Sequence, residues 1–424
     1  MNQKEIRSWV MYDWANSAFA LTIIAAVLPI FYHDVAAKGL SDSLATAYWG
    51  YSQSIAVIIV VILAPILGAM ADYTGAKKKF LGFFAAIGII ASMLLALVNE
   101  GDYLLASLLF IMGAVGFSGA NVFYDGFLPE ITPKGKIDQI SARGYAFGYI
   151  GGGILLVINL MMIMKYSWFG IPSKTMATQL SFVTVGIWWF LFAIPLFRNV
   201  KERKRSGMGH SQKHYIKISF SRLAATLKDI RQYQELLKFL IAYWLFNDGI
   251  GTIIKMATIY GRDIGIGTTD LIAALVITQF VGIPCTFLFG WLTQKIPSKR
   301  ALMLALWVYV VIVLLGFFMT TALHFYILAM LVGLVQGGAH SLSRSIYGTM
   351  IPANKNAEFF GFYGISSKFS TILGPAVFAF TGQLMGSSRF GILSVVIFFL
   401  AGIILLHRVN VEKGLLEAQG KSIA

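Results

Sequence analysis

Long apolar segments recur along this chain of 424 residues, and they constrain its fold more than any other feature. A helix needs about 20 apolar residues to cross the roughly 30 Å hydrocarbon core of a bilayer. Only 12% of the residues are charged, against about a quarter in soluble domains. We therefore predict an all-α polytopic membrane protein with 12 transmembrane helices. The expected spans are 9–32, 46–71, 80–98, 103–128, 142–165, 178–197, 238–260, 270–293, 300–320, 323–350, 358–383 and 389–407.

The basic residues are distributed unevenly over the expected loops. With the N-terminus in the cytoplasm, 26 of the 34 Lys and Arg residues fall on the cytoplasmic side, five fall outside and three fall within spans. This is the positive-inside bias that sets the orientation of membrane proteins. We therefore expect both termini to be cytoplasmic. The net charge of +15 follows from this topology and indicates no nucleic-acid partner, and the lipid bilayer is the expected surrounding.

One polar and basic segment, residues 199–237, separates six expected spans from six others. The predicted domains are therefore an N-terminal six-helix bundle at 1–198, a cytoplasmic linker, and a C-terminal six-helix bundle at 238–424. This layout is typical of transporters whose two halves are parallel repeats. The part at 218–238 has helical apolar spacing and could lie along the membrane surface, although a solvated linker is the simpler interpretation.

Weak internal similarity supports a duplication of the two halves. Tyr12 and Asn16 in the first span recur as Tyr243 and Asn247 in the seventh, at a constant offset. The segment "GAMADYTGAKKK" after span two corresponds to "GWLTQKIPSKR" after span eight, where Gln294 stands in place of the acid.

The segment from Gly68 to Lys78 carries a spaced pattern of glycine, acid, glycine and base. Gly68 permits close helix contact, and Gly75 permits the backbone to turn with positive φ. Asp72 can face a helix N-terminus, and Lys77 and Lys78 are expected at the anionic cytoplasmic leaflet. The pattern resembles the loop signature of the major facilitator superfamily. The resemblance implies that these five residues form a conformational latch.

Three further motifs resemble one branch of that superfamily, the unknown major facilitators, which includes vacuolar amino-acid effluxers linked to autophagy in yeast. They are "YDWANSAF" in span one, "RGYAFGYIGGG" at 143–153 and "FFGFYGISSKFSTILGP" at 359–375. The resemblance implies a secondary transporter, with amino-acid efflux as its activity, and it places Arg143 with the gate. The glycines at 144–153 also resemble a motif of antiporters, but close helix packing is the simpler interpretation.

Ionisable side chains within a span are costly and need a partner or a function. In the implied fold, spans one, four, seven and ten line a central cavity, where a base could hold a solute carboxylate and an acid could carry a coupling proton. Structural alternatives stay open: Asp248 could neutralise Lys368, Asp13 and Asp125 could contact the cytoplasmic interface, and the aromatic residues could belong to membrane belts. The candidate substrate or proton residues are Asp248, Lys255, Lys368, Arg344, Asn247, Asn16, Asp13, Asp125, Trp14 and Tyr243.

The sequence lacks the motifs of hydrolases, metalloenzymes and ATP-driven pumps. Cys285 is the only cysteine, so thiolate metal sites and disulfides have no support. We therefore expect no cofactor, no metal and no enzymatic activity.

The sequence favours a monomeric, proton-coupled or facilitative transporter that exports a small polar solute, an amino acid or small peptide, by alternating access of two halves. Alternatives are an importer of a sugar, sugar phosphate or other organic anion, and a non-transporting receptor or lipid-handling protein. A bacterial inner membrane is the expected location, and a vacuolar membrane stays open.

Overall fold

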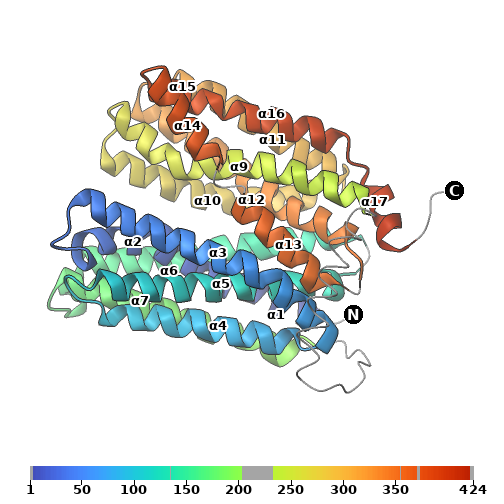
Figure 1. Ribbon diagram of the computed structural model, residues 1–424, viewed down its shortest axis with the longest axis horizontal. Coiled ribbons are helices and arrows are strands. Elements are labelled where there is room, and N and C mark those ends of the chain that lie inside the picture. Colours follow the sequence, from blue (N-terminus) through green and yellow to red (C-terminus); the bar gives the residue numbers. More distant parts are fainter. Residues whose placement is uncertain (1–2, 134, 203–232, 354, 370–372, 421–424) are drawn as a thin grey trace. The chain divides into compact units, whose positions relative to one another are not determined.

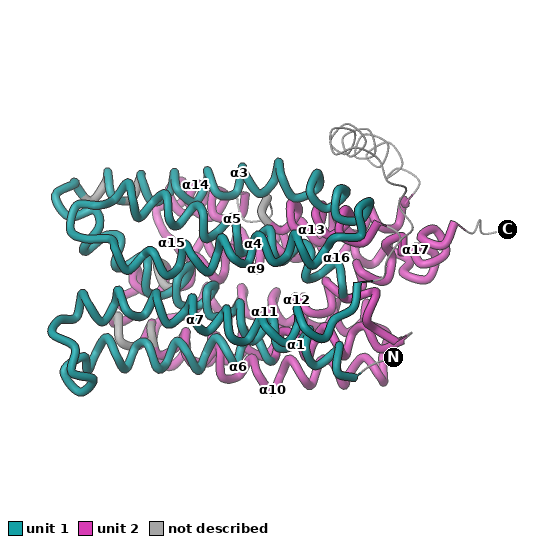
Figure 2. Tube along the Cα trace, turned by 90° about the horizontal axis from the view of Figure 1, so that it is seen from below, with its two compact units in different colours: residues 1–127, 147–219 teal, residues 128–146, 220–424 magenta. Residues whose placement is uncertain are grey.

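The computed structural model describes residues 3–133, 135–202, 233–353, 355–369 and 373–420, and every regular element in these ranges is a helix. By their internal contacts the residues form two compact units, coloured separately in Figure 2. Unit 1 comprises residues 1–127 and 147–219, and unit 2 comprises residues 128–146 and 220–424. Helices α5 and α6 therefore contribute residues to both units.

Unit 1 holds the helices of the first half of the chain, which Figure 1 labels and colours from blue to green. They are α1 (Gln3–Ala18), η1 (Phe19–Ala26), α2 (Leu28–Phe31), η2 (Tyr32–Ala36), α3 (Asp42–Thr74), α4 (Lys77–Leu94), η3 (Leu95–Leu97), α5 (Tyr103–Ile131), α6 (Ile137–Met164), η4 (Tyr166–Phe169) and α7 (Lys174–Asn199).

Unit 2 holds the helices of the second half, drawn from yellow to red in Figure 1. They are α9 (Gln234–Asp263), α10 (Thr268–Leu292), α11 (Ser298–Phe317), α12 (Ala322–Met350), α13 (Asn356–Phe369), α14 (Leu373–Leu384), α15 (Ser388–Ser394), α16 (Val396–His407) and α17 (Val411–Ala418).

The predicted all-α membrane architecture is confirmed. Among the described residues, 10 helices are long and apolar enough to cross a bilayer, and one bent pair raises the number to 11. The remaining expected span, 358–383, is described as α13 and α14 on either side of residues 370–372. Its two helices have 14 and 12 residues, so each is shorter than a full span. Residues 203–232 lie outside the described part of the structure. They make up most of the expected linker and most of the surface helix considered at 218–238.

The first span is a broken helix rather than the continuous one expected. Residues Phe19–Ala26 form a π-helix, and the helical axis bends by 41° where α2 begins. The amide of Val27 donates to the carbonyl of Thr22, 2.8 Å away and five residues earlier. Pro29 has no amide hydrogen and lies at the start of α2, where a helix needs none. A π-bulge and a proline are recognised causes of such bends.

Glycines on α6 allow α1 to pack against it at backbone distance. A Cβ at Gly148 would lie 2.5 Å from the Ser17 hydroxyl, and a Cβ at Gly151 would lie 2.5 Å from the backbone oxygen of Trp14. Gly153, in contrast, has no atom within 4 Å of its Cβ position among the described residues. In the absence of a hydrophobic driving force, such close packing holds membrane helices together.

We predict opposite effects of alanine at two neighbouring glycines. Gly151→Ala forces α1 and α6 apart and should destabilise the protein by about 1–3 kcal/mol, the usual cost of overpacking. Gly153→Ala meets open space and should be neutral or stabilising by up to about 1 kcal/mol, because alanine is the better helix former. Thermal unfolding of the two variants in detergent micelles measures the difference. Equal stability of both variants would contradict close packing at Gly151.

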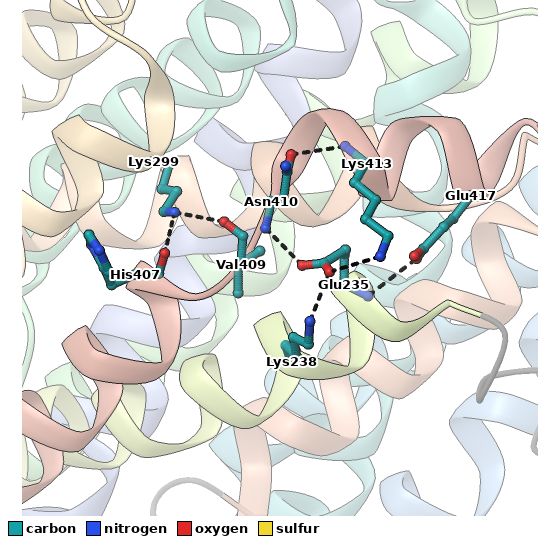
Figure 3. Close-up of polar contacts among 8 residues, drawn as sticks. All are labelled: Glu235, Lys238, Lys299, His407, Val409, Asn410, Lys413 and Glu417. Carbon is teal, nitrogen blue, oxygen red and sulfur yellow. Dashed lines mark hydrogen bonds and ion pairs between the residues drawn. The ribbon is translucent and has the colours of Figure 1, made fainter. Parts of the chain in front are cut away.

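The C-terminal helix α17 is attached to the start of α9 at Glu235, whose carboxylate is buried and whose backbone amide donates to a Glu417 carboxylate oxygen at 3.2 Å (Figure 3). One oxygen of the Glu235 carboxylate accepts a hydrogen bond from the Asn410 amide at 2.8 Å. The other accepts from the Lys238 ammonium at 2.8 Å and lies 3.9 Å from the Lys413 ammonium. Beside it, the Lys299 ammonium donates to the carbonyls of His407 and Val409 at the end of α16. Glu235 thus joins α9, α17 and the loop between α16 and α17.

Removal of this carboxylate should release α17. In Glu235→Ala the Asn410 amide loses its acceptor, which costs about 1–3 kcal/mol if the amide stays buried, whereas the partly exposed lysines regain water. We expect a lower unfolding temperature and faster proteolysis after residue 409. Glu412→Ala, which removes an exposed acid on the same helix, should leave both unchanged. If α17 is equally protected in both variants, Glu235 does not hold it.

Candidate functional site

In unit 1, the polar residues of the first span join α1 to α5. The Tyr124 hydroxyl donates to a carboxylate oxygen of Asp13 at 2.8 Å, and the Asn16 amide donates to the Asn121 side-chain oxygen at 2.6 Å. The Trp9 ring stacks on the Tyr124 ring with centroids 4.4 Å apart, and its indole nitrogen donates to the Tyr124 carbonyl at 2.9 Å. Asp13 and Asn16 therefore face the same neighbouring helix.

The other first-half candidates are Trp14 and Asp125. Trp14 faces α6 and α7: its ring stacks on that of Trp188 at 5.9 Å, and its carbonyl accepts from the Trp188 indole at 3.2 Å. Asp125 follows Tyr124 on α5 and is partly buried. Trp14 therefore packs against aromatic neighbours within unit 1.

The segment from Gly68 to Lys78 forms an ion pair within itself at the end of α3. Gly75 has φ of +62° and ends the helix, as a left-handed glycine commonly does. The chain then turns so that the Lys77 ammonium lies 2.8 Å from a carboxylate oxygen of Asp72. Their side chains are 6% and 3% exposed, so the expected location of Lys77 at the lipid headgroups is wrong. Burial demands a partner for this charge, and Asp72 supplies one.

Lys78 binds the end of α7. Its ammonium donates to the carbonyls of Phe197 and Val200 at 2.7 and 2.9 Å, at the end of α7. Its amide donates to a Glu202 carboxylate oxygen at 2.8 Å. A cation at this position satisfies carbonyls that the helix leaves unpaired. The expectation of Lys78 at the leaflet stays a prediction. Gly68 is buried on α3, and Arg143, at the start of α6, is exposed.

In unit 2, Asp248 is the most deeply buried acid among the candidates, with 1% of its surface exposed. One carboxylate oxygen accepts the amide of Gly374, 2.9 Å away in the first turn of α14. Thr252, one turn along α9, donates to the Asp248 carbonyl at 2.7 Å. Lys255 lies about two turns from Asp248 on α9 and is exposed within the unit. The side chain of Lys368 lies outside the described part of the structure.

Two further candidates of α9 are buried. Asn247 is 4% exposed and Tyr243 is 2% exposed. The Tyr243 ring stacks on that of Tyr363 at 4.5 Å, and Tyr363 contacts Tyr347 at 4.9 Å. Tyr243 therefore belongs to a packed aromatic cluster of α9, α12 and α13.

Arg344 on α12 is 2% exposed and binds the beginning of α6. Its Nε donates to the Ser141 hydroxyl and a terminal nitrogen donates to the Ser141 carbonyl, both at 2.9 Å. Its guanidinium lies 4.3 Å from the centre of the Tyr145 ring, a cation–π distance. In the same region, Ser345 donates to Asp138 at 2.5 Å, and Ser298 also donates to that acid.

Two polar residues on α12, Gln336 and His340, were not among the predicted candidates. They precede Arg344 by eight and four residues and so lie along one side of the helix. The His340 ring stacks on that of Tyr145 at 6.1 Å, and Gln336 lines a cavity. The four-residue spacing in "QGGAHSLSR" is a signal that could have indicated them. No group of three or more His, Cys, Asp or Glu side chains suited to a metal occurs among the described residues.

The fold is that of the major facilitator superfamily. The proton:xylose symporter XylE superposes with a TM-score of 0.73 at 14% identity, over 98% of each chain. The transporter FucP, solved in the outward conformation, superposes with a TM-score of 0.66 at 16% identity, over 97% of this chain and 99% of FucP.

The sequence places the chain within one family of these transporters. Residues 1–419 match the family described as "Vacuole effluxer Atg22 like", and the chain belongs to this family. The MFS-type transporter YxiO of Bacillus subtilis is 43% identical over 411 residues, which cover 96% of this chain and 95% of YxiO. Autophagy-related protein 22 of Coccidioides immitis is 24% identical over 539 residues, covering 99% and 88%. The protein is therefore a membrane transporter and not an enzyme.

The buried pair of Asp72 and Lys77 should show strong energetic coupling. Lys77→Ala leaves a buried carboxylate without its charged partner and should destabilise unit 1 by about 3–5 kcal/mol. The double variant Asp72→Ala with Lys77→Ala should cost less than the sum of the single changes, because neither charge is left behind. Lys79→Ala, at the exposed neighbouring base, is the control. Additive single effects in thermal unfolding would exclude the coupling.

Proposed function

We propose that this transporter exports a small polar solute, an amino acid or a small peptide, and that proton movement drives the export. Two six-helix halves, at 1–198 and 238–424, alternate access to a site near the bilayer midplane. The segment 199–237 joins the halves, the protein acts as a monomer in a bacterial inner membrane, and both termini face the cytoplasm. The family description, vacuole effluxer, supports export.

The observation that carries the proposal is the burial of Asp248 on a helix that also bears Lys255. An ionised carboxylate in a membrane span is costly, yet Asp248 is 1% exposed and accepts a hydrogen bond from the backbone amide of Gly374. Such a group can take up and release a proton as its surroundings change. Lys255 supplies a cation about two turns away, suited to a solute carboxylate.

The polar residues of unit 1 support a second part of the proposal. Asp13 and Asn16 bind α5 through side-chain hydrogen bonds, so a change in their partners would alter how α1 and α5 pack. We assign Asp13, Asn16, Asp125 and Arg344 to gating rather than to direct contact with the solute. The segment from Gly68 to Lys78, together with Arg143, serves as the latch.

Proton coupling predicts a selective defect in Asp248→Asn. The asparagine oxygen can still accept the Gly374 amide, so the fold is preserved, but the side chain cannot ionise. In proteoliposomes loaded with radiolabelled amino acids, we expect flux driven by a pH gradient to fall by about tenfold or more. Counterflow without a gradient should persist. The matched control is Asp263→Asn, which changes an exposed acid at the end of the same helix.

Two results would contradict this proposal. Gradient-driven flux in Asp248→Asn equal to that of the wild type would remove Asp248 from proton coupling. Failure of the wild type to move any amino acid or dipeptide, while it moves a sugar or another organic anion, would overturn the solute class and leave the transporter fold intact.

A further inference from the structure

Unit 2 contains a cavity of about 110 Å³ between four long helices. Its walls are formed mainly by aliphatic side chains of α9, α10, α11 and α12. Ile253 and Ala257 contribute from α9, Ala274 from α10, Ile312 from α11, and Ala329 and Val332 from α12. Two of the wall residues are exposed, Ile254 by 41% and Leu275 by 46%. The wall therefore includes side chains of α9 and α10 that also reach the surface of the chain.

Two amide side chains interrupt the apolar wall, Gln279 on α10 and Gln336 on α12. The side-chain oxygen of Gln279 is buried and has no hydrogen-bond partner among the residues that the structure describes. The neighbouring Thr278 hydroxyl already contacts the carbonyls of Ala274 and Ala329, at 3.0 and 3.2 Å. A buried acceptor without a donor is unfavourable. The wall therefore favours a molecule that brings one.

The size of the cavity limits what can occupy it. An engineered apolar cavity of about 150 Å³ accepts a benzene molecule, so a cavity of 110 Å³ suits a smaller group, such as an aliphatic chain of three or four carbons. Away from Gln279 and Gln336, the apolar walls exclude a charged or strongly hydrated group. Gln279 fixes where the donor of the molecule must lie.

We propose that this cavity is the subsite that selects the solute by its apolar part. It takes an aliphatic group of up to about four carbons, and the Gln279 oxygen accepts a hydrogen bond from a donor next to that group. Lys255 lies one residue after the wall residue Ile254 on α9. This inference rests on the proposed function, because it treats the aliphatic group as the side chain of a transported amino acid.

A series of linear amino acids tests the subsite by length: alanine, 2-aminobutyrate, norvaline and norleucine. Each methylene buried in the cavity should lower the KM of the wild type by about fourfold. Ala329→Leu fills the cavity and should remove this gain for norvaline and norleucine while leaving alanine nearly unchanged. Ala257→Leu fills the cavity from another wall and provides the same test if Ala329→Leu does not fold. Ala401→Leu, on α16 away from the cavity, is the control.

Gln279→Leu separates the polar contact from the apolar one. Loss of the acceptor should raise the KM of all four amino acids by a similar factor, about fivefold, and should leave the dependence on chain length unchanged. The subsite is overturned if both cavity-filling variants keep the dependence of the wild type on chain length, or if the wild type transports all four equally well. The assignment of Gln279 is overturned if Gln279→Leu transports like the wild type.

A separate binding measurement tests the cavity independently of the proposed solute class. If the wild type transports none of the four amino acids, the aliphatic side chain is not part of the solute, and binding of 4,4,4-trifluorobutan-1-ol to the purified protein then tests whether the cavity is an apolar subsite. Saturable broadening of its ¹⁹F resonance, lost in Ala329→Leu and retained in Ala401→Leu, would support an apolar subsite. Absence of saturable binding in the wild type would overturn it.

Discussion

The hydrocarbon core of a bilayer offers no water to polar groups, and this constraint determines how the chain is built. Helices satisfy the backbone, but an embedded side-chain donor, acceptor or charge is costly unless it finds a partner. The solutions differ along the chain. Lys77 is neutralised by Asp72, Asp248 accepts a backbone amide, and Arg344 donates to both the hydroxyl and the carbonyl of Ser141. Single hydrogen bonds in membranes contribute only about 0.6 kcal/mol on average, so the burial of charges imposes the stricter demand.

The sequence predicted those features that depend on composition over about 20 residues or on a local backbone rule. The apolar spans, the superfamily and the positive φ of Gly75 all belong to this class. Features that depend on a partner were not predictable. Lys77 was expected at the lipid surface because a lysine at a helix end commonly lies there, yet the turn at Gly75 places it against Asp72. The break in the first span was missed because a π-helix has the same apolar composition as an α-helix, and Pro29 alone does not indicate where it begins.

Most of the candidate substrate or proton residues carry a charge, and charge indicates some polar groups of the structure but not others. Asp248 and Arg344 are buried groups whose cost demands a partner, and charge alone indicates them. Gln336 and His340 occupy the same side of α12 as Arg344, but neither carries an obligatory charge, so only their spacing distinguishes them. Gln279 could not be found from sequence, because its importance depends on the apolar walls that other helices place around it.

The polar groups of the two units are used differently, and this difference supports the assignment of their roles. In unit 1, Asp13 and Asn16 are engaged with α5, so they fix how two helices meet. In unit 2, Asp248 holds the first turn of α14 through the amide of Gly374, and the absence of a side chain at Gly374 permits that approach, since a Cβ there would collide with Thr252. An ionised carboxylate is attracted by the positive end of a helix dipole, and a protonated one is not. Under the proposed proton coupling, protonation of Asp248 would remove this attraction to α14, so the coupling proton would act on a helix rather than on a single side chain.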